Sequence, residues 1–142
     1  MSGGGVEHTL GSDLRIAADN TRILMPELDM GIFFSNGSIN ILPRLIGESR
    51  AKQMMLLGEE ITAEKALEFG LVTEVCTPET LDDHLRCRAE KLAAKDPYAL
   101  KLAKQLIHGA REDTLNGSLY KEGCAMVDTG RSKGAKSRIQ AF

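Results

Sequence analysis

The chain has 142 residues, enough for one modest domain with a hydrophobic core. Its hydrophobic content of 42% and charged content of 27% are ordinary for a soluble globular protein. The formal net charge of −2 indicates neither a nucleic-acid partner nor a membrane partner. No apolar run approaches the roughly 20 residues that a membrane-spanning helix needs.

The three cysteines, Cys76, Cys87 and Cys124, form no CxxC pair, and an odd number does not suit a disulfide framework. A reducing compartment is therefore expected, which favours the cytoplasm, with the mitochondrial matrix as the alternative in a eukaryote. The residues after Met1 lack the basic and apolar regions of a signal peptide. The three histidines show no metal-ligand spacing, so no metal is expected.

The first half of the chain is predicted to mix helices and strands. Hydrophobic spacing and turn residues indicate a helix start over 3–10, strands over 14–18 and 22–26, a loop over 31–37, and helices over 38–46 and 48–57. Pro43 predicts an early break or a kink in the helix over 38–46.

The second half is predicted to be almost entirely helical. A short helix over 63–69, capped by Thr62, precedes a strand over 71–75. Further helices begin at Thr77-Pro78, at Asp96-Pro97 and at residue 113 or 114. Their apolar stripes need a partner, either additional sheet or another subunit. The basic stretch 131–142 is expected to be a solvated helix end, with a phosphate contact as the alternative. We place a domain boundary between 1–76 and 77–142.

Two glutamates stand in distinctive settings, Glu7 after a glycine run and Glu27 after Met25-Pro26. Glycines let backbone approach a ligand closely, and two facing carboxyls can handle a water molecule and a proton. From these motifs alone, simpler interpretations remain open. Glu7 could stabilise a helix dipole, Glu27 could be a turn residue, and the glycine run could be a flexible leader.

The order of motifs along the whole chain resembles the enoyl-CoA hydratase/isomerase (crotonase) family. The matching stretches are Gly-Gly-Gly-Val-Glu at 3–7, Ser-Asp-Leu-Arg-Ile-Ala-Ala at 12–18, Met-Pro-Glu-Leu-Asp-Met-Gly at 25–31, Leu-Pro-Arg-Leu-Ile-Gly at 42–47, the stretch from Ala51 to Ala66, and Phe-Gly-Leu-Val-Thr-Glu-Val at 69–75. This resemblance implies an α/β fold, a spiral of ββα units followed by a helical oligomerisation region. The chain resembles the second half of that fold.

The resemblance also implies roles for particular residues. Gly4 would donate one N–H to the thioester oxygen, Glu7 would activate water, and Glu27 would deliver a proton to Cα. Substrate-binding positions implied in the same way are Gly3, Gly5, Phe34, Ser35 and Asn36. For Ser35 and Asn36 the alternative, that they simply form a turn, remains equally open. Hydratases of the family usually carry a Pro-Gly-Ala-Gly-Gly-type loop where this chain has residues 33–38, which leaves the acyl specificity open.

The implied activity is hydration of a 2-enoyl-CoA thioester, as in fatty-acid metabolism, by a homo-oligomer such as a trimer or hexamer. Coenzyme A would be part of the substrate, and no separate cofactor is expected. One alternative is another reaction of the family on an acyl-CoA ester, namely isomerisation, thioester hydrolysis or decarboxylation. Another is a non-catalytic fragment whose helical half mediates assembly.

Overall fold

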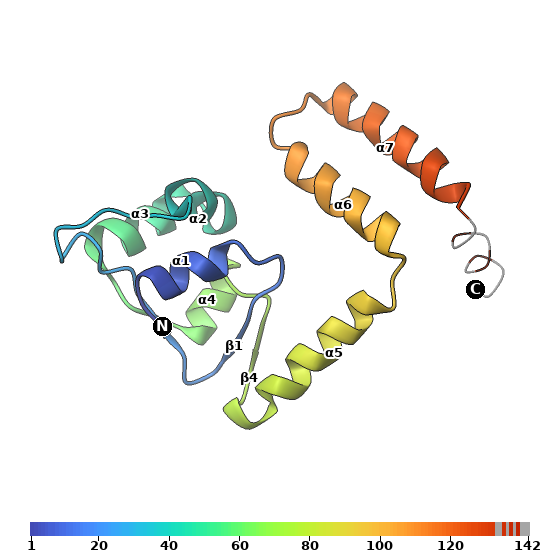
Figure 1. The fold of residues 1–142 in the computed structure, drawn as a ribbon. Helices are drawn as coiled ribbons and strands as arrows, with labels where there is room; N and C mark the ends of the chain where they lie inside the picture. Colours follow the sequence, from blue (N-terminus) through green and yellow to red (C-terminus); the bar gives the residue numbers. More distant parts are fainter. Residues whose placement is uncertain (133–134, 136, 138, 140–142) are drawn as a thin grey trace. The chain divides into compact units, whose positions relative to one another are not determined.

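The computed structural model describes residues 1–132, 135, 137 and 139 (Figure 1). Internal contacts divide the chain into two units, Met1–Arg86 and Cys87–Phe142. The boundary predicted after residue 76 stays a prediction. The basic helix end predicted over 131–142 falls largely outside the described residues, which do not include Lys133, Lys136 or Arg138.

Four helices lie wholly within the first unit, close to the predicted positions. They are α1 (Gly4–Leu10), α2 (Ser38–Ile46), α3 (Glu48–Leu57) and α4 (Ala63–Phe69). The hydroxyl of Thr62 caps α4 by accepting the Lys65 N–H at 3.2 Å, as predicted. Helix α2 continues through Pro43, so the predicted break there is wrong; the helix ends instead at Gly47, whose φ is +86°.

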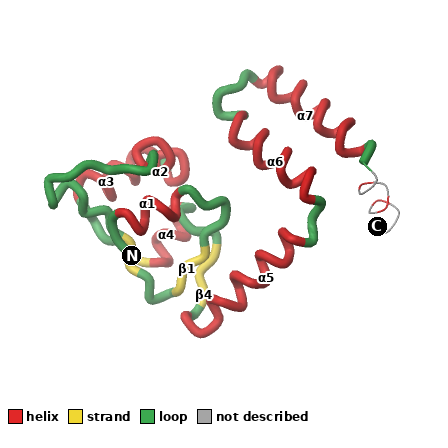
Figure 2. Tube along the Cα trace, in the orientation of Figure 1, coloured by secondary structure: helices red, strands yellow, loops and turns green. Residues whose placement is uncertain are grey.

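The strands are short and pair in two separate ladders (Figure 2). Strand β1 (Ile16–Ala18) runs parallel to β4 (Glu74–Cys76), and β2 (Arg22–Ile23) runs antiparallel to β3 (Ile61–Thr62). The sequence did not indicate β3. The strand predicted over 71–75 begins later, because the N–H groups of Leu71 and Val72 donate to the carbonyl of Ala66 at the end of α4.

The strand predicted over 22–26 is shortened to two residues, and the next residue, Leu24, pairs with the start of the chain. Leu24 forms an isolated parallel bridge with Ser2. The Gly3 N–H donates to the Leu24 carbonyl at 3.1 Å, and the Leu24 N–H donates to the Met1 carbonyl at 3.2 Å. These bonds hold the glycine run beside the segment that leads to Glu27.

The hydrophobic core of the first unit lies around α1, α2 and α3. Its most deeply buried large side chains come from five different elements or loops, and they include Val6, Ile23, Met25, Leu42 and Met54. Full burial of one such side chain stabilises the fold by about 1.5–3 kcal/mol. This core fixes the orientation of α1, and therefore of its carboxylate.

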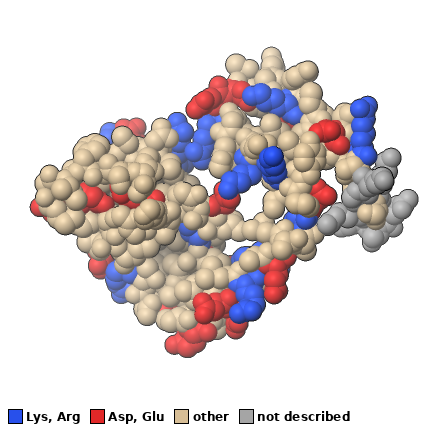
Figure 3. Space-filling model, viewed as in Figure 1, with Lys and Arg blue, Asp and Glu red and all other residues tan. Residues whose placement is uncertain are grey.

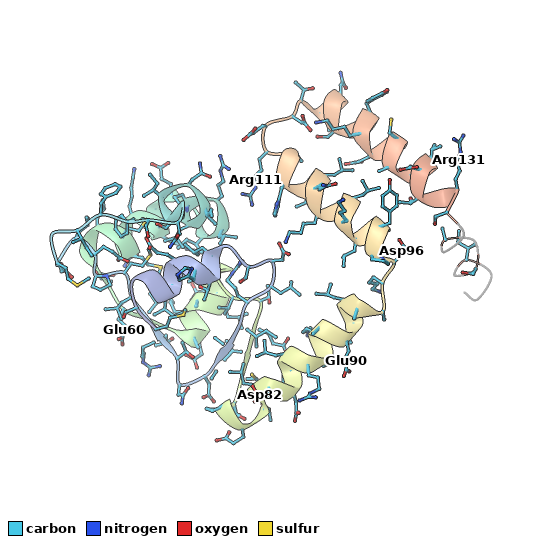
Figure 4. All side chains as sticks on the ribbon, viewed as in Figure 1. Glu60, Asp82, Glu90, Asp96, Arg111 and Arg131 are labelled. Carbon is cyan, nitrogen blue, oxygen red and sulfur yellow. The ribbon has the colours of Figure 1, made fainter. Side chains whose placement is uncertain are left out.

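In the second unit, α6 (Pro97–Gly109) and α7 (Leu115–Gly130) lie side by side and antiparallel (Figure 1). Helix α5 (Leu81–Ala93) follows a short 3₁₀ turn, Pro78–Thr80, and spans the division between the units. The carboxylate of Asp96, labelled in Figure 4, caps α6 by accepting two N–H groups at 2.9 and 3.0 Å. The Tyr98 hydroxyl donates to Asp128 and joins the two helices.

The surfaces of α6 and α7 keep large apolar side chains exposed. Ile107, Leu115, Tyr120 and Met126 are each at least two-thirds exposed. Acidic and basic side chains are interspersed on the face shown in Figure 3. Within the part of the chain that the structure describes, none of the helices combines the length and apolarity of a membrane span.

Candidate active site

Glu7 lies on the inner side of α1, with 3% of its surface exposed. Its neighbours on the helix are Val6, which is buried in the core, and His8, which is exposed. Because α1 packs against α2, the carboxylate faces the loop that leads into α2. Burial of a carboxylate is unfavourable unless hydrogen bonds replace its water.

The loop that leads into α2 surrounds the Glu7 carboxylate with hydrogen bonds. Oε1 accepts the Ser35 backbone N–H at 2.5 Å and the Ser38 hydroxyl at 3.0 Å, and Oε2 accepts the Ser35 hydroxyl at 2.5 Å. Burial raises the pKa of Glu7, but hydrogen bonds from Ser35, Ser38 and Asn36 outweigh it, and the net pKa lies below its usual value. Glu7 is therefore held as a carboxylate at neutral pH.

Glu27 presents the opposite arrangement. It is also 3% exposed, yet neither of its carboxyl oxygens has a hydrogen-bond partner among the described residues. Its backbone carbonyl is fixed, because it accepts the N–H groups of Met30 and Ile32 at 3.1 and 3.0 Å. A buried carboxyl without a partner is uncommon and calls for a functional explanation. Both oxygens of Glu27 therefore keep their full acceptor capacity unused within the described protein.

Gly3 connects the two glutamates. Its carbonyl accepts the Glu7 N–H at 3.1 Å, and a Cβ at Gly3 would lie 3.3 Å from Oε1 of Glu27. The φ of Gly3 is +51°, a conformation that favours glycine. The first glycine of the run is thus required both by its backbone conformation and by the close approach of Glu27.

The other two glycines of the run begin helix α1. The Gly5 N–H donates to the Ser2 carbonyl at 3.1 Å. The Gly4 N–H has no acceptor among the backbone carbonyls of the described residues, and Gly4 is exposed. A Cβ at Gly4 would meet nothing within 4 Å. Gly4 therefore offers an accessible N–H donor one turn away from Glu7.

The loop over residues 31–37 brings Ser35 and Asn36 to Glu7. Phe34 is partly buried and packs against the core, whereas Phe33 is 71% exposed. The two rings meet edge to face, with their centroids 5.6 Å apart. Asn36, two residues after Phe34, has a φ of +52°. The predicted roles of Phe34, Ser35 and Asn36 toward substrate stay predictions.

Sequence reasoning did not assign Ser38, whose side chain is fully buried against Glu7. The signal available in the sequence was the Ser-Asn-Gly-Ser order, because Asn-Gly is typical of a tight turn that brings its flanking residues together. Among the described residues, no group of three or more His, Cys, Asp or Glu side chains is arranged to hold a metal ion.

Comparison with known proteins shows extensive similarity. The sequence profile described as enoyl-CoA hydratase/isomerase matches residues 1–142. A short-chain-enoyl-CoA hydratase of Clostridium acetobutylicum is 34% identical over 99% of this chain and 54% of its own length. A 1,2-epoxyphenylacetyl-CoA isomerase of Escherichia coli is also 34% identical, over 99% of this chain and 54% of its own length.

A solved structure of an enoyl-CoA hydratase from Bacillus anthracis superimposes with a TM-score of 0.94 at 35% identity, and the match covers 99% of this chain and 55% of that one. The predicted crotonase-like α/β fold is thereby confirmed. The chain spans about half the length of the curated relatives it matches. Profile, sequence and structure agree, and the chain belongs to the enoyl-CoA hydratase/isomerase family.

Proposed function

We propose that the protein containing this chain adds water across the double bond of a 2-enoyl-CoA thioester. The observation that carries this proposal is the pair of buried glutamates around Gly3, one with its oxygens engaged by hydrogen bonds and the other with both oxygens unpartnered among the described residues. Two carboxyls in such different environments suit different roles in proton transfer.

In the proposed reaction, the Glu7 carboxylate accepts a proton from water while the water oxygen bonds to Cβ of the enoyl group. The π electrons of the double bond move toward the thioester, whose oxygen accepts a hydrogen bond from the Gly4 N–H. Glu27 then delivers a proton to Cα. Return of one proton from Glu7 to Glu27 restores the site, so that one water molecule is consumed for each hydroxyacyl product.

The proposed substrate class is the acyl-CoA thioester, with coenzyme A entering as part of the substrate. The named relatives support this class, since they include a short-chain-enoyl-CoA hydratase and a 1,2-epoxyphenylacetyl-CoA isomerase. A homo-oligomer, trimer or hexamer, is proposed as well. The exposed apolar side chains of α6 and α7, such as Ile107, Leu115 and Met126, support a role of the second unit in assembly.

The test is loss of the ultraviolet absorbance of the enoyl thioester when the purified protein meets crotonyl-CoA, with Glu27→Gln measured in parallel. We expect turnover by the unmodified protein and its loss in the variant. Undiminished hydration by a folded Glu27→Gln protein would contradict the mechanism.

A second reaction of the family, double-bond or epoxide isomerisation, is favoured by one observation. The isomerase of Escherichia coli matches this chain at the same identity and coverage as the hydratase. An isomerase needs only one group to move a proton between carbons, and neither oxygen of Glu27 is occupied by a hydrogen bond within the described residues. Mass analysis of the products separates the two reactions, because hydration adds the mass of one water and isomerisation adds none.

A further inference from the structure

A tight turn at Asn36-Gly37 brings two serine side chains onto the same carboxylate. Asn36 and Gly37 have φ values of +52° and +75°, and the Ser38 N–H donates to the Ser35 carbonyl at 3.0 Å. Two consecutive residues with positive φ, closed by this bond, make a turn that strongly favours Asn-Gly. The turn places Ser35 and Ser38 side by side, and both contact Glu7.

The hydrogen bonds do not fall evenly on the two oxygens of Glu7. A carboxylate oxygen can accept about two hydrogen bonds. Oε1 receives the Ser35 N–H and the Ser38 hydroxyl, whereas Oε2 receives the Ser35 hydroxyl. Both oxygens of Glu7 are thus engaged by the turn, and Asn36 adds a further side-chain hydrogen bond to the carboxylate.

The Ser38 hydroxyl has a single proton and two nearby acceptors, Oε1 of Glu7 at 3.0 Å and the Ser35 carbonyl at 2.9 Å. A charged carboxylate is the stronger acceptor of the two. Ser38 is completely buried and no solvent can compete for its proton. Its hydroxyl therefore stabilises the ionised form of Glu7, with the Ser35 carbonyl as the alternative acceptor of the same proton.

We propose that Ser35 and Ser38 are positioning residues that hold the ionised Glu7 carboxylate in one orientation for proton transfer from the reacting water. The inference rests on the proposed function for the identity of that water, and on the geometry of Glu7 for the rest. It explains why a buried base accepts so many hydrogen bonds. These bonds lower the basicity of Glu7, but they also fix the direction in which it accepts a proton.

Burial and hydrogen bonds together set the pKa shift of Glu7, and neighbouring charged groups are not among its causes. His8 on α1 and Arg44 on α2 are exposed. Glu27 approaches the start of α1 at Gly3. Removing one serine hydroxyl should therefore raise the pKa of Glu7 without altering a charge–charge interaction.

The experiment measures two quantities on the same proteins: the pH titration of the Glu7 carboxyl carbon, in protein labelled with ¹³C-glutamate, and the pH profile of crotonyl-CoA hydration. Glu7→Gln identifies the resonance. Ser35→Ala removes the hydroxyl but keeps the backbone N–H, and Ser35→Thr restores a hydroxyl. Ser12→Ala is the matched control, since Ser12 is exposed beyond the end of α1.

We expect the pH midpoint of the Glu7 carboxyl titration to rise in Ser35→Ala and to stay low in Ser35→Thr and Ser12→Ala. The acid limb of kcat/KM should move to higher pH in Ser35→Ala, and kcat should fall by about tenfold with little change in KM, since a hydrogen bond to a charged group is lost. If Ser35→Ala does not fold, Ser38→Ala carries the same comparison.

An unchanged Glu7 midpoint in a folded Ser35→Ala protein would overturn the inference, even with hydratase activity intact. A raised midpoint in a protein that hydrates no enoyl-CoA would support the hydrogen-bonded arrangement of Glu7 and reject the proposed function. The titration therefore tests the positioning of Glu7, and the turnover separately tests the proposed function.

Discussion

Substitution of Gly3 by alanine tests whether the start of α1 is shaped by its contact with Glu27. Gly3 has φ +51° and ψ −127°, a combination that side-chain-bearing residues rarely adopt. Holding an alanine there costs about 1–3 kcal/mol. The new Cβ would also lie 3.3 Å from Oε1 of Glu27, closer than an ordinary contact, so the carboxyl must move by a few tenths of an ångström.

We expect Gly3→Ala to lower the free energy of unfolding by about 2 kcal/mol, mainly through backbone strain. We also expect turnover to fall by about tenfold or more, because displacement of a catalytic group by 1 Å costs roughly 10²-fold. Urea denaturation gives the first quantity and crotonyl-CoA hydration, measured where the variant is fully folded, gives the second.

Gly11→Ala is the matched control at the other end of the same helix. Its φ is −75°, and the added Cβ would lie at an ordinary distance of 3.5 Å from the His8 carbonyl. Its stability should be unchanged or raised by about 0.5 kcal/mol, with full turnover. If Gly3→Ala matched Gly11→Ala in both stability and turnover, the argument that Gly3 is fitted around Glu27 would be refuted.

Three further predictions concern side chains. Glu27→Gln should lower turnover by roughly 10²–10⁴-fold at nearly unchanged stability, because its oxygens make no hydrogen bonds within the described protein; a large loss of stability would contradict this. Since the folded pKa of Glu7 is lowered, its stabilisation is present above the unfolded pKa and disappears as pH falls through the folded pKa. Glu7→Gln should therefore be less stable than the unmodified protein at neutral pH, by about 1.5–3 kcal/mol, and the difference should vanish in acid; a difference independent of pH in urea denaturation would oppose it. Asp96→Ala removes a cap that accepts two N–H groups and should cost about 1 kcal/mol in thermal or urea unfolding; an unchanged midpoint would show that the cap contributes nothing.

The contrast between the two glutamates bears on which reaction the site favours. Both are equally buried, but hydrogen bonds hold Glu7 and leave Glu27 without partners among the described residues. A carboxylate held in one direction suits a base that acts on a single water. A carboxyl with both oxygens available suits a proton donor that must reach a substrate carbon. This division of roles is what hydration requires.

The local elements and the identity of the candidate residues could be predicted from the sequence. Proline, glycine and capping signals predicted the boundaries of α3 and α4 and the starts of α6 and α7, because these depend on neighbours within one helical turn. The glycine run and the two glutamates stand out by their local settings, and the order of motifs showed the resemblance to the family.

The contacts between those residues could not be predicted, because they depend on how distant segments pack. The pairing of β2 with β3, and of Leu24 with Ser2, depends on which segments approach in space, and residues far apart in sequence carry no local signal for it. The same holds for the hydrogen bonds from Ser35 and Ser38 to Glu7, which cross 28 and 31 residues. The turn that makes them possible is local, but its target is set by the packing of α1 against α2.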